Sequence, residues 1–111
     1  MTSLSTHVLD TMNGRPAAEM AVTLSGPDGE IARDITNGDG RCPALMQSAL
    51  APGRYTIRFG VAAYFRGLGV DLPDPPFLDE VAVDFGIAAD GGHYHVPLLV
   101  SPYGYSTYRG S

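Results

Sequence analysis

The chain has 111 residues and a formal net charge of −5 at pH 7, and its composition is 44% hydrophobic and 17% charged. This length fits a single domain over residues 1–111, and the high apolar content predicts a homo-oligomer that covers part of its surface. Basic residues do not cluster in this acidic chain, which excludes nucleic acid and anionic membranes as expected partners.

The first ten residues, MTSLSTHVLD, contain no basic region followed by an apolar run, so they do not resemble a secretory signal. The single cysteine, Cys42, cannot form an intrachain disulfide. No apolar stretch approaches the roughly 20 residues that a membrane-spanning helix needs. These features predict a cytoplasmic protein.

Apolar residues alternate with small or polar residues in several stretches, which predicts seven or eight short strands. In chain order the expected strands lie around residues 4–9, 20–25, 31–36, 55–59, 81–85, 94–98 and 103–109. The GPDG sequence at residues 26–29 supplies proline and glycine at turn positions, so we expect a hairpin between the second and third strands.

Residues 61–68, VAAYFRGL, are the one expected helix, of one or two turns packed against a sheet edge. Clusters of Gly, Pro and Asp separate the strands. This spacing is typical of an antiparallel β-sandwich rather than of a fold that alternates strands with helices.

Three histidines, His7, His93 and His95, lie in strand-like surroundings. Residues two apart on a strand share a face, so His93 and His95 point one way while Tyr94 and Val96 point the other way. One face of each strand in a sandwich packs on the core. We therefore expect both histidines to point away from the core or to line a pocket.

This histidine set is compatible with two kinds of functional site. A His-x-His pair and a distant third histidine supply three ligands for zinc and leave the fourth position open. Without a metal, a neutral imidazole takes a proton from water while an arginine holds an anionic substrate. Arg41 follows a glycine-rich turn, from which a loop residue projects into a site. The spacing is equally compatible with histidines and an arginine that have no chemical role.

Three stretches together resemble one enzyme family: STHVLD near the start, DGR in the middle, and HYHVPLLVSPYGYSTYRGS at the end. The chain is similar over essentially its whole length to the transthyretin-related 5-hydroxyisourate hydrolases, whose signature is the closing YRGS. Transthyretin itself lacks that ending. The resemblance favours the enzyme, and the alternative function is a transthyretin-like protein that binds a small ligand without catalysis.

The resemblance implies a transthyretin-like antiparallel β-sandwich of two four-stranded sheets with one short helix, an all-β fold. It also implies a homotetramer whose active sites lie in a channel between dimers. The implied reaction is the hydrolysis of 5-hydroxyisourate, a small purine-derived molecule, to 2-oxo-4-hydroxy-4-carboxy-5-ureidoimidazoline in urate degradation. No cofactor and no metal are expected.

The resemblance also assigns the site residues. The implied catalytic residues are His7, Arg41, His95 and Ser111, and the implied substrate-binding residues are Arg41, Tyr108, Arg109 and Gly110. Arg41 is expected to pair with the anionic ring of the substrate, a charge-assisted contact of roughly 1.5 to 3 kcal/mol. Either His7 or His95 is the expected base, and His93 is expected to orient a neighbour or to be structural.

Overall fold

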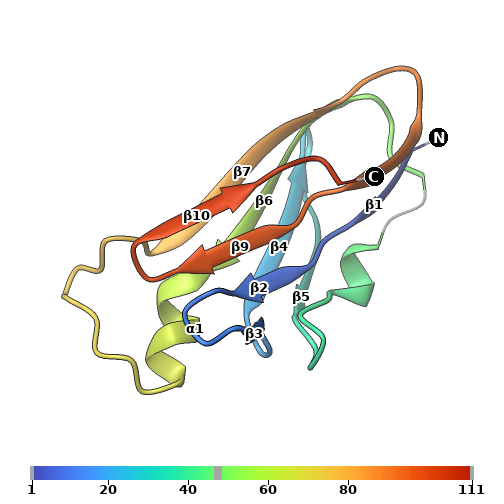
Figure 1. Cartoon of the computed structure of the whole chain (residues 1–111). Helices are drawn as coiled ribbons and strands as arrows, with labels where there is room; N and C mark the ends of the chain where they lie inside the picture. Colours follow the sequence, from blue (N-terminus) through green and yellow to red (C-terminus); the bar gives the residue numbers. More distant parts are fainter. Residues whose placement is uncertain (1, 47–48, 111) are drawn as a thin grey trace.

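The computed structural model describes residues 2–46 and 49–110, which form a sandwich of two sheets with one α-helix at one end (Figure 1). Its elements are β1 (Thr2–Ser5), β2 (Val8–Asp10), β3 (Arg15–Pro16), β4 (Ala21–Gly26), β5 (Gly29–Ile35), the 3₁₀ turn η1 (Pro43–Leu45), β6 (Gly53–Gly60), α1 (Val61–Gly67), β7 (Glu80–Ile87), β8 (Gly92–His95), β9 (Leu98–Ser101) and β10 (Gly104–Thr107). One four-stranded sheet has the order β10-β9-β2-β3, and the other has the order β5-β4-β6-β7. The two four-stranded sheets, the helix and the β4-β5 hairpin confirm the sequence prediction.

The strands β1 and β8 form a further pair that continues the β2-β9 pairing. Ser5 lies opposite His95 and Val8 lies opposite Leu98, so the register is the same before and after the break. Backbone hydrogen bonds cross the break, from Val96 N to the Ser5 carbonyl and from Leu98 N to the His7 carbonyl. The pair therefore extends the β10-β9-β2-β3 sheet, and we refer to this extended layer as the histidine sheet.

Two strand pairs of the histidine sheet run in a direction that the sequence does not predict. The pairs β1-β8 and β2-β9 are parallel, whereas an antiparallel sandwich was expected throughout. The alternation of residues locates a strand and its buried face, but it does not fix the direction in which two distant strands pair. The parallel pairing determines which side chains of β1 face those of β8.

The core fills the space between the two sheets with alternate residues of each strand. Phe59 and Ile57 of β6 are fully buried and belong to the same core cluster as Val8 and Leu98 of the histidine sheet and Phe65 of the helix. The residues between them on each strand point outward. Polar side chains at those outward positions are consequently available for chemistry.

A buried polar group joins the helix to the histidine sheet. The Asp10 carboxylate, only 1% exposed, accepts hydrogen bonds from the Tyr64 hydroxyl at 2.7 Å and from the Asn13 side chain at 2.7 Å. Burial alone raises the pKa of Asp10, but the hydrogen bonds from Asn13 and Tyr64 outweigh it and hold the pKa below its ordinary value. Burial and the bond to Asp10 raise the pKa of Tyr64 to about 12.

Replacing Tyr64 with phenylalanine keeps the ring and removes one hydrogen bond to a charged acceptor. We expect the free energy of unfolding at neutral pH to fall by about 1.5 to 3 kcal/mol. The contribution of Asp10 is present at neutral pH and is lost as the pH falls through its lowered folded pKa, so the difference between the two proteins should shrink in acid. Urea denaturation at both pH values measures this, and equal stability at neutral pH would contradict the assignment.

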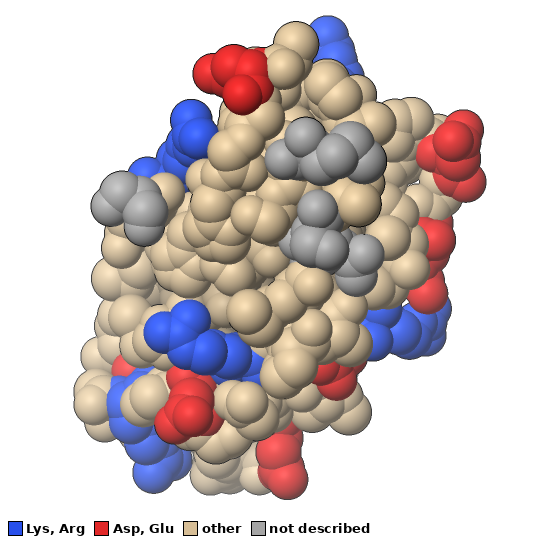
Figure 2. Space-filling view, turned by 90° about the vertical axis from the view of Figure 1, so that its right-hand side faces the viewer, with Lys and Arg blue, Asp and Glu red and all other residues tan. Residues whose placement is uncertain are grey.

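The face shown in Figure 2 carries basic and acidic side chains in small groups, and near its lower edge the two kinds lie next to one another. No helix within residues 2–46 and 49–110 is long and apolar enough to cross a membrane.

Candidate active site

The outer face of the histidine sheet carries a row of polar side chains where β1 lies beside β8. Ser3 is paired with His93 and Ser5 with His95, and all four residues share the face opposite the core. Tyr94, which alternates with the histidines, is 6% exposed on the core side, so the predicted facing of this strand is confirmed. His93 is exposed and His95 is half-buried.

Ser5 connects the two histidines of β8. Its Oγ lies 2.9 Å from Nε2 of His93 and 2.8 Å from Nδ1 of His95. Ser5 is only 8% exposed. Ser3 Oγ lies 2.6 Å from Nδ1 of His93. The Nδ1 atom of His95 is thereby engaged, which leaves Nε2 as the nitrogen available for a substrate or water.

The environment of His95 favours its neutral form. Burial lowers the pKa of His95 below its ordinary value of 6.5, and repulsion by Arg41, and by His7 and His93 in their protonated forms, lowers it further. Arg41 and His7 are thus near enough to His95 to influence its charge. A neutral imidazole at pH 7 is able to accept a proton from water.

The loop ITNGDGR, residues 35–41, positions Arg41 beside His7. The side-chain oxygen of Asn37 accepts hydrogen bonds from the backbone N–H groups of Asp39 at 2.9 Å and Arg41 at 3.1 Å, which closes the loop. Val8 N donates to the Gly40 carbonyl, and His7 and Arg41 form a β-bridge. Arg41 is therefore held next to the histidine sheet by its backbone.

Gly40 is required by this close approach. Its φ angle of 74° lies in the left-handed region, and an added Cβ would lie only 2.4 Å from the Val8 carbonyl oxygen. A side chain at this position would push the loop away from the sheet. The glycine in DGR is thus explained by backbone contact, and the arginine that follows it remains free for chemistry.

The same loop also orients His7. The Nε2–H group of His7 donates to the Asp39 carbonyl at 2.7 Å, so Nδ1 is the only nitrogen of the neutral ring that accepts a proton. Arg41 is exposed, and among the described residues its guanidinium has no carboxylate within ion-pair distance. His7, Arg41 and His95 therefore form one site with an unpaired positive charge.

Gly110 completes this site from the C-terminal stretch. Its N–H donates to the His95 carbonyl at 2.7 Å, and the two residues form a β-bridge. An added Cβ at Gly110 would lie 2.7 Å from Cδ2 of the His95 ring. The His95 imidazole occupies the space that any larger residue at position 110 would need.

Tyr108 and Arg109 lie in a different place from the histidine face. The Arg109 guanidinium carbon is 3.9 Å from the centroid of the Tyr94 ring, and Nη2 is 3.4 Å from the His93 carbonyl oxygen. Both residues border an apolar hollow of about 220 Å³ between β7 and the end of β10, with Val83 and Val96 in its wall. Ser111 lies outside the described residues.

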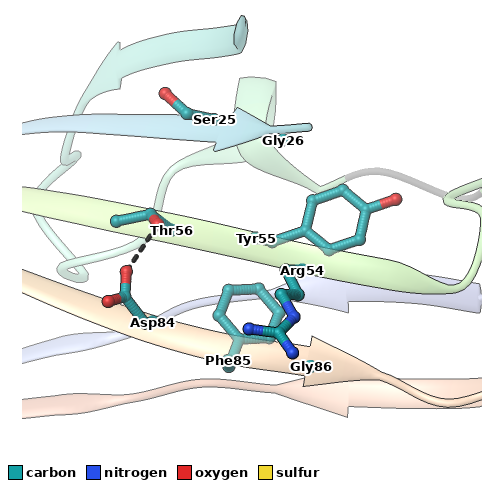
Figure 3. Close-up of a pocket in the computed structure, with 8 residues that line it drawn as sticks. All are labelled: Ser25, Gly26, Arg54, Tyr55, Thr56, Asp84, Phe85 and Gly86. Atoms are coloured by element: carbon teal, nitrogen blue, oxygen red, sulfur yellow. Dashed lines mark hydrogen bonds between the residues drawn. The ribbon is translucent and has the colours of Figure 1, made fainter. Parts of the chain in front are cut away.

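A larger hollow, of about 520 Å³, lies on the second sheet and contains none of the predicted site residues. Figure 3 shows its lining, in which Thr56 is hydrogen-bonded to Asp84 at 2.6 Å. The Arg54 side chain extends from β6 two residues before Thr56. The lining contains no histidine. The histidine sheet, whose outer face is open in a single chain, is therefore the candidate site.

The zinc site that the histidine spacing allows needs three ligands placed around one point. Among the described residues, no group of three or more His, Cys, Asp or Glu side chains is placed to hold a metal ion. His93 and His95 are instead joined through Ser5.

Ser3, Ser5 and Asn37 were not among the residues singled out from the sequence. The two serines share the alternation of His7, at every second position of residues 3–7, and this pattern indicates a polar face. Their contact with His93 and His95 depends on the parallel pairing, which the sequence does not reveal.

Comparison with known proteins gives a consistent result over the whole chain. The sequence model of the HIUase/Transthyretin family matches residues 4–110. A 5-hydroxyisourate hydrolase from Ralstonia nicotianae is 52% identical over 117 residues, covering 100% of each chain. 

Solved structures agree with this similarity. The structure of 5-hydroxyisourate hydrolase from Klebsiella pneumoniae superposes with a TM-score of 0.87 at 36% identity and covers 100% of both chains. Sea bream transthyretin in complex with thyroxine superposes with a TM-score of 0.84 at 30% identity, covering 96% of this chain and 93% of that one.

Proposed function

The chain belongs to the HIUase/Transthyretin family, and on that premise we propose that it hydrolyses 5-hydroxyisourate to 2-oxo-4-hydroxy-4-carboxy-5-ureidoimidazoline, a step of urate degradation. The observation that carries the proposal is the grouping of a half-buried His95, with its lowered pKa, beside Arg41 and His7 on one face. The full-length similarity to 5-hydroxyisourate hydrolases supports the same reaction.

In this proposal His95 is the general base. Its Nε2 removes a proton from the water molecule that attacks the lactam carbonyl, because its Nδ1 is hydrogen-bonded to Ser5 and its ring is neutral at pH 7. The sequence alone left His7 and His95 as alternatives. His7, whose Nε2–H is held by the Asp39 carbonyl, binds and orients the water or the substrate through Nδ1.

Arg41 holds the anionic ring and stabilises the negative charge that grows on oxygen during attack. Its planar guanidinium offers two parallel N–H donors to such a group, and no neighbouring carboxylate among the described residues competes for them. The positive charge also keeps His95 unprotonated. Arg41 thus contributes to substrate binding and also keeps the base, His95, in its neutral form.

The C-terminal residues act mainly through the position of β8. Gly110 is hydrogen-bonded to the His95 backbone at the edge of β8, and Arg109 packs on the Tyr94 ring. We therefore assign Gly110 and Arg109 as positioning residues for His95. The substrate contacts of Tyr108, Arg109 and Gly110 and the catalytic role of Ser111 stay predictions from the family resemblance.

We also propose that the protein assembles as a homotetramer that encloses the site. Among the described residues, β7 and β10 are the outermost strands of their sheets, and both border the same hollow. Tyr103 and Tyr105 of this region are 61% and 48% exposed, which is aromatic area available for a second copy. Stacking of two such dimers around His95 and Arg41 would exclude water from the reacting centre, with Ser3 and His93 at the solvent-accessible mouth of the channel.

Turnover distinguishes the enzyme from a small-ligand carrier. We expect the purified protein to accelerate the loss of 5-hydroxyisourate absorbance well beyond the spontaneous decay measured in a parallel sample without protein. A carrier would bind the compound in stoichiometric amount and leave the decay rate unchanged. Light scattering on the same sample gives the mass of the assembly, and a monomer at micromolar concentration would contradict the tetramer.

Gly110→Ala tests whether the C-terminal stretch positions His95. The new Cβ would lie 2.7 Å from the imidazole and displace it, and a misplacement of about 1 Å costs about 10²-fold in rate. We expect kcat/KM for 5-hydroxyisourate to fall by that order while the circular-dichroism spectrum is unchanged.

Gly67→Ala is the matched control for this substitution. At Gly67, the last residue of α1, no atom lies within 4 Å of an added Cβ, so this variant should turn over like the wild type. Equal activity of the two alanine variants would show that Gly110 does not position the base.

A further inference from the structure

Four side chains of the β1-β8 pair form a continuous hydrogen-bonded row from the site to the surface. The row runs from His95 Nδ1 to Ser5 Oγ over 2.8 Å, on to His93 Nε2 over 2.9 Å, and from His93 Nδ1 to Ser3 Oγ over 2.6 Å. The parallel register places Ser5 opposite His95 and Ser3 opposite His93. Both nitrogens of His93 are used, although this residue lies outside the proposed reacting centre.

The hydrogen-bonding capacity of these groups limits how the protons are arranged. A serine hydroxyl has one proton, and a neutral imidazole has one N–H donor and one acceptor nitrogen. If Ser5 donates to His93, then His95 Nδ1–H must donate to Ser5, and His93 Nδ1–H must donate to Ser3. If Ser5 donates to His95, every bond in the row reverses. The row therefore has two complete arrangements, and one converts into the other by moving a proton across each bond.

We propose that Ser5 and His93 form a proton relay between His95 and solvent, with Ser3 at its outer end. The proposal rests on the proposed function, because it concerns the proton that His95 takes from water. The geometry on which it stands is the row of three hydrogen bonds on one face of the parallel pair.

Each transfer in the relay conserves protons. The Nε2 atom of His95 takes one proton from the attacking water, and the Nδ1 proton of His95 passes to Ser5 Oγ. The original Ser5 proton passes to His93 Nε2, and the Nδ1 proton of His93 passes to Ser3 and from there to solvent. His95 ends neutral with its proton on Nε2, and one proton has left the protein.

The reaction requires such an exit. Opening the lactam gives a carboxylic acid and a ureido nitrogen; the acid is ionised at pH 7 and the nitrogen is not basic, so one proton is released for each turnover. Arg41 and His7 both disfavour positive charge on His95. His93 is exposed, whereas Ser5 is buried between the two rings, so the row leads from a partly desolvated base to water.

Ser5→Ala breaks the relay at its buried link. We expect kcat to fall by about 10²-fold, near the lower limit of what a positioned proton transfer contributes, with KM nearly unchanged because Ser5 lies beneath the imidazoles. Ser5→Thr keeps the hydroxyl and should retain most of kcat. Ser25→Ala, on the other sheet, is the control for a serine substitution in a strand.

His93→Ala tests the relay by rescue with added imidazole, which a purely structural role of His93 would not allow. Removing the exposed imidazole leaves a space that is open to solvent, so added imidazole buffer should restore kcat in a concentration-dependent way. The same buffer should not restore Ser5→Ala, whose break is buried.

The outcomes separate this relay from the function on which it rests. A wild-type protein without turnover would overturn both proposals. An active wild type whose Ser5→Ala variant keeps its kcat, or whose His93→Ala variant loses kcat without rescue by imidazole, would overturn the relay alone.

Discussion

Replacing His95 with asparagine is expected to lower kcat/KM for 5-hydroxyisourate by about 10² to 10⁴-fold, the range that a positioned general base contributes. Asparagine offers an amide in place of the ring, so it is able to bond to Ser5, but it cannot take a proton from water at neutral pH. The half-buried side chain lies on the outer face of the sheet and is not part of the apolar core. The fold should therefore persist.

Steady-state kinetics and thermal unfolding of the same preparation measure this prediction. The matched comparison is His7→Asn, which removes the ring that is bonded to the Asp39 carbonyl. If His95 is the base and His7 orients, then His95→Asn should lose more kcat, while His7→Asn should show a larger share of its loss in KM. A His95→Asn protein with nearly wild-type turnover would show that the base is elsewhere.

Truncation after Thr107 is expected to abolish measurable turnover and to leave the sandwich folded. It removes the Gly110 hydrogen bond to the His95 backbone and the packing of Arg109 on Tyr94, both of which restrain β8. Tyr108 and Arg109 are exposed and contribute nothing to the buried core. The loss should therefore appear in activity, because the position of the base is sensitive to small displacements.

Circular dichroism and the turnover assay on the truncated protein test both halves of this expectation. Arg109→Met is the informative intermediate, because methionine retains contact with the Tyr94 ring while it lacks the positive charge and the N–H donors. A truncated protein that keeps its β signal and most of its activity would mean that residues 108–111 are dispensable for the site.

The sequence predicts the local structure of this protein well because each local signal has a local cause. Period-2 alternation identifies the buried face of β8, and the Pro27-Asp28 turn joins β4 and β5 as expected. The short helix begins at Val61, where the expected helix begins. In each case the residues that specify the feature lie next to one another in the chain.

The remaining features depend on contacts between distant residues. Ser5 and His95 meet only because β1 and β8 pair in parallel across most of the chain, and neither residue carries a local sign of that partner. Substrate binding by Arg109 stays a prediction; in the structure its guanidinium lies on the Tyr94 ring, on the face opposite His95. Residue type indicates which side chains are able to act, whereas the sheet register decides which of them meet.

The acid limb of kcat/KM, measured beside the NMR titration of His95, tests the central claim that this imidazole is the base. Because burial and the charges of Arg41, His7 and His93 lower the pKa of His95, the rate should fall only below the ordinary value of 6.5. The midpoint of that fall should coincide with the NMR titration of His95.

Two substitutions of Arg41 test in the same measurement whether its charge lowers the pKa of His95. Arg41→Met removes a positive charge, so the pKa of His95 should rise and the acid limb should move to higher pH. Arg41→Lys keeps the charge and should leave the midpoint in place while the rate falls through loss of the planar donor pair. An acid limb that does not follow the His95 titration, or that stays unmoved in Arg41→Met, would contradict the assignment of His95 as the base.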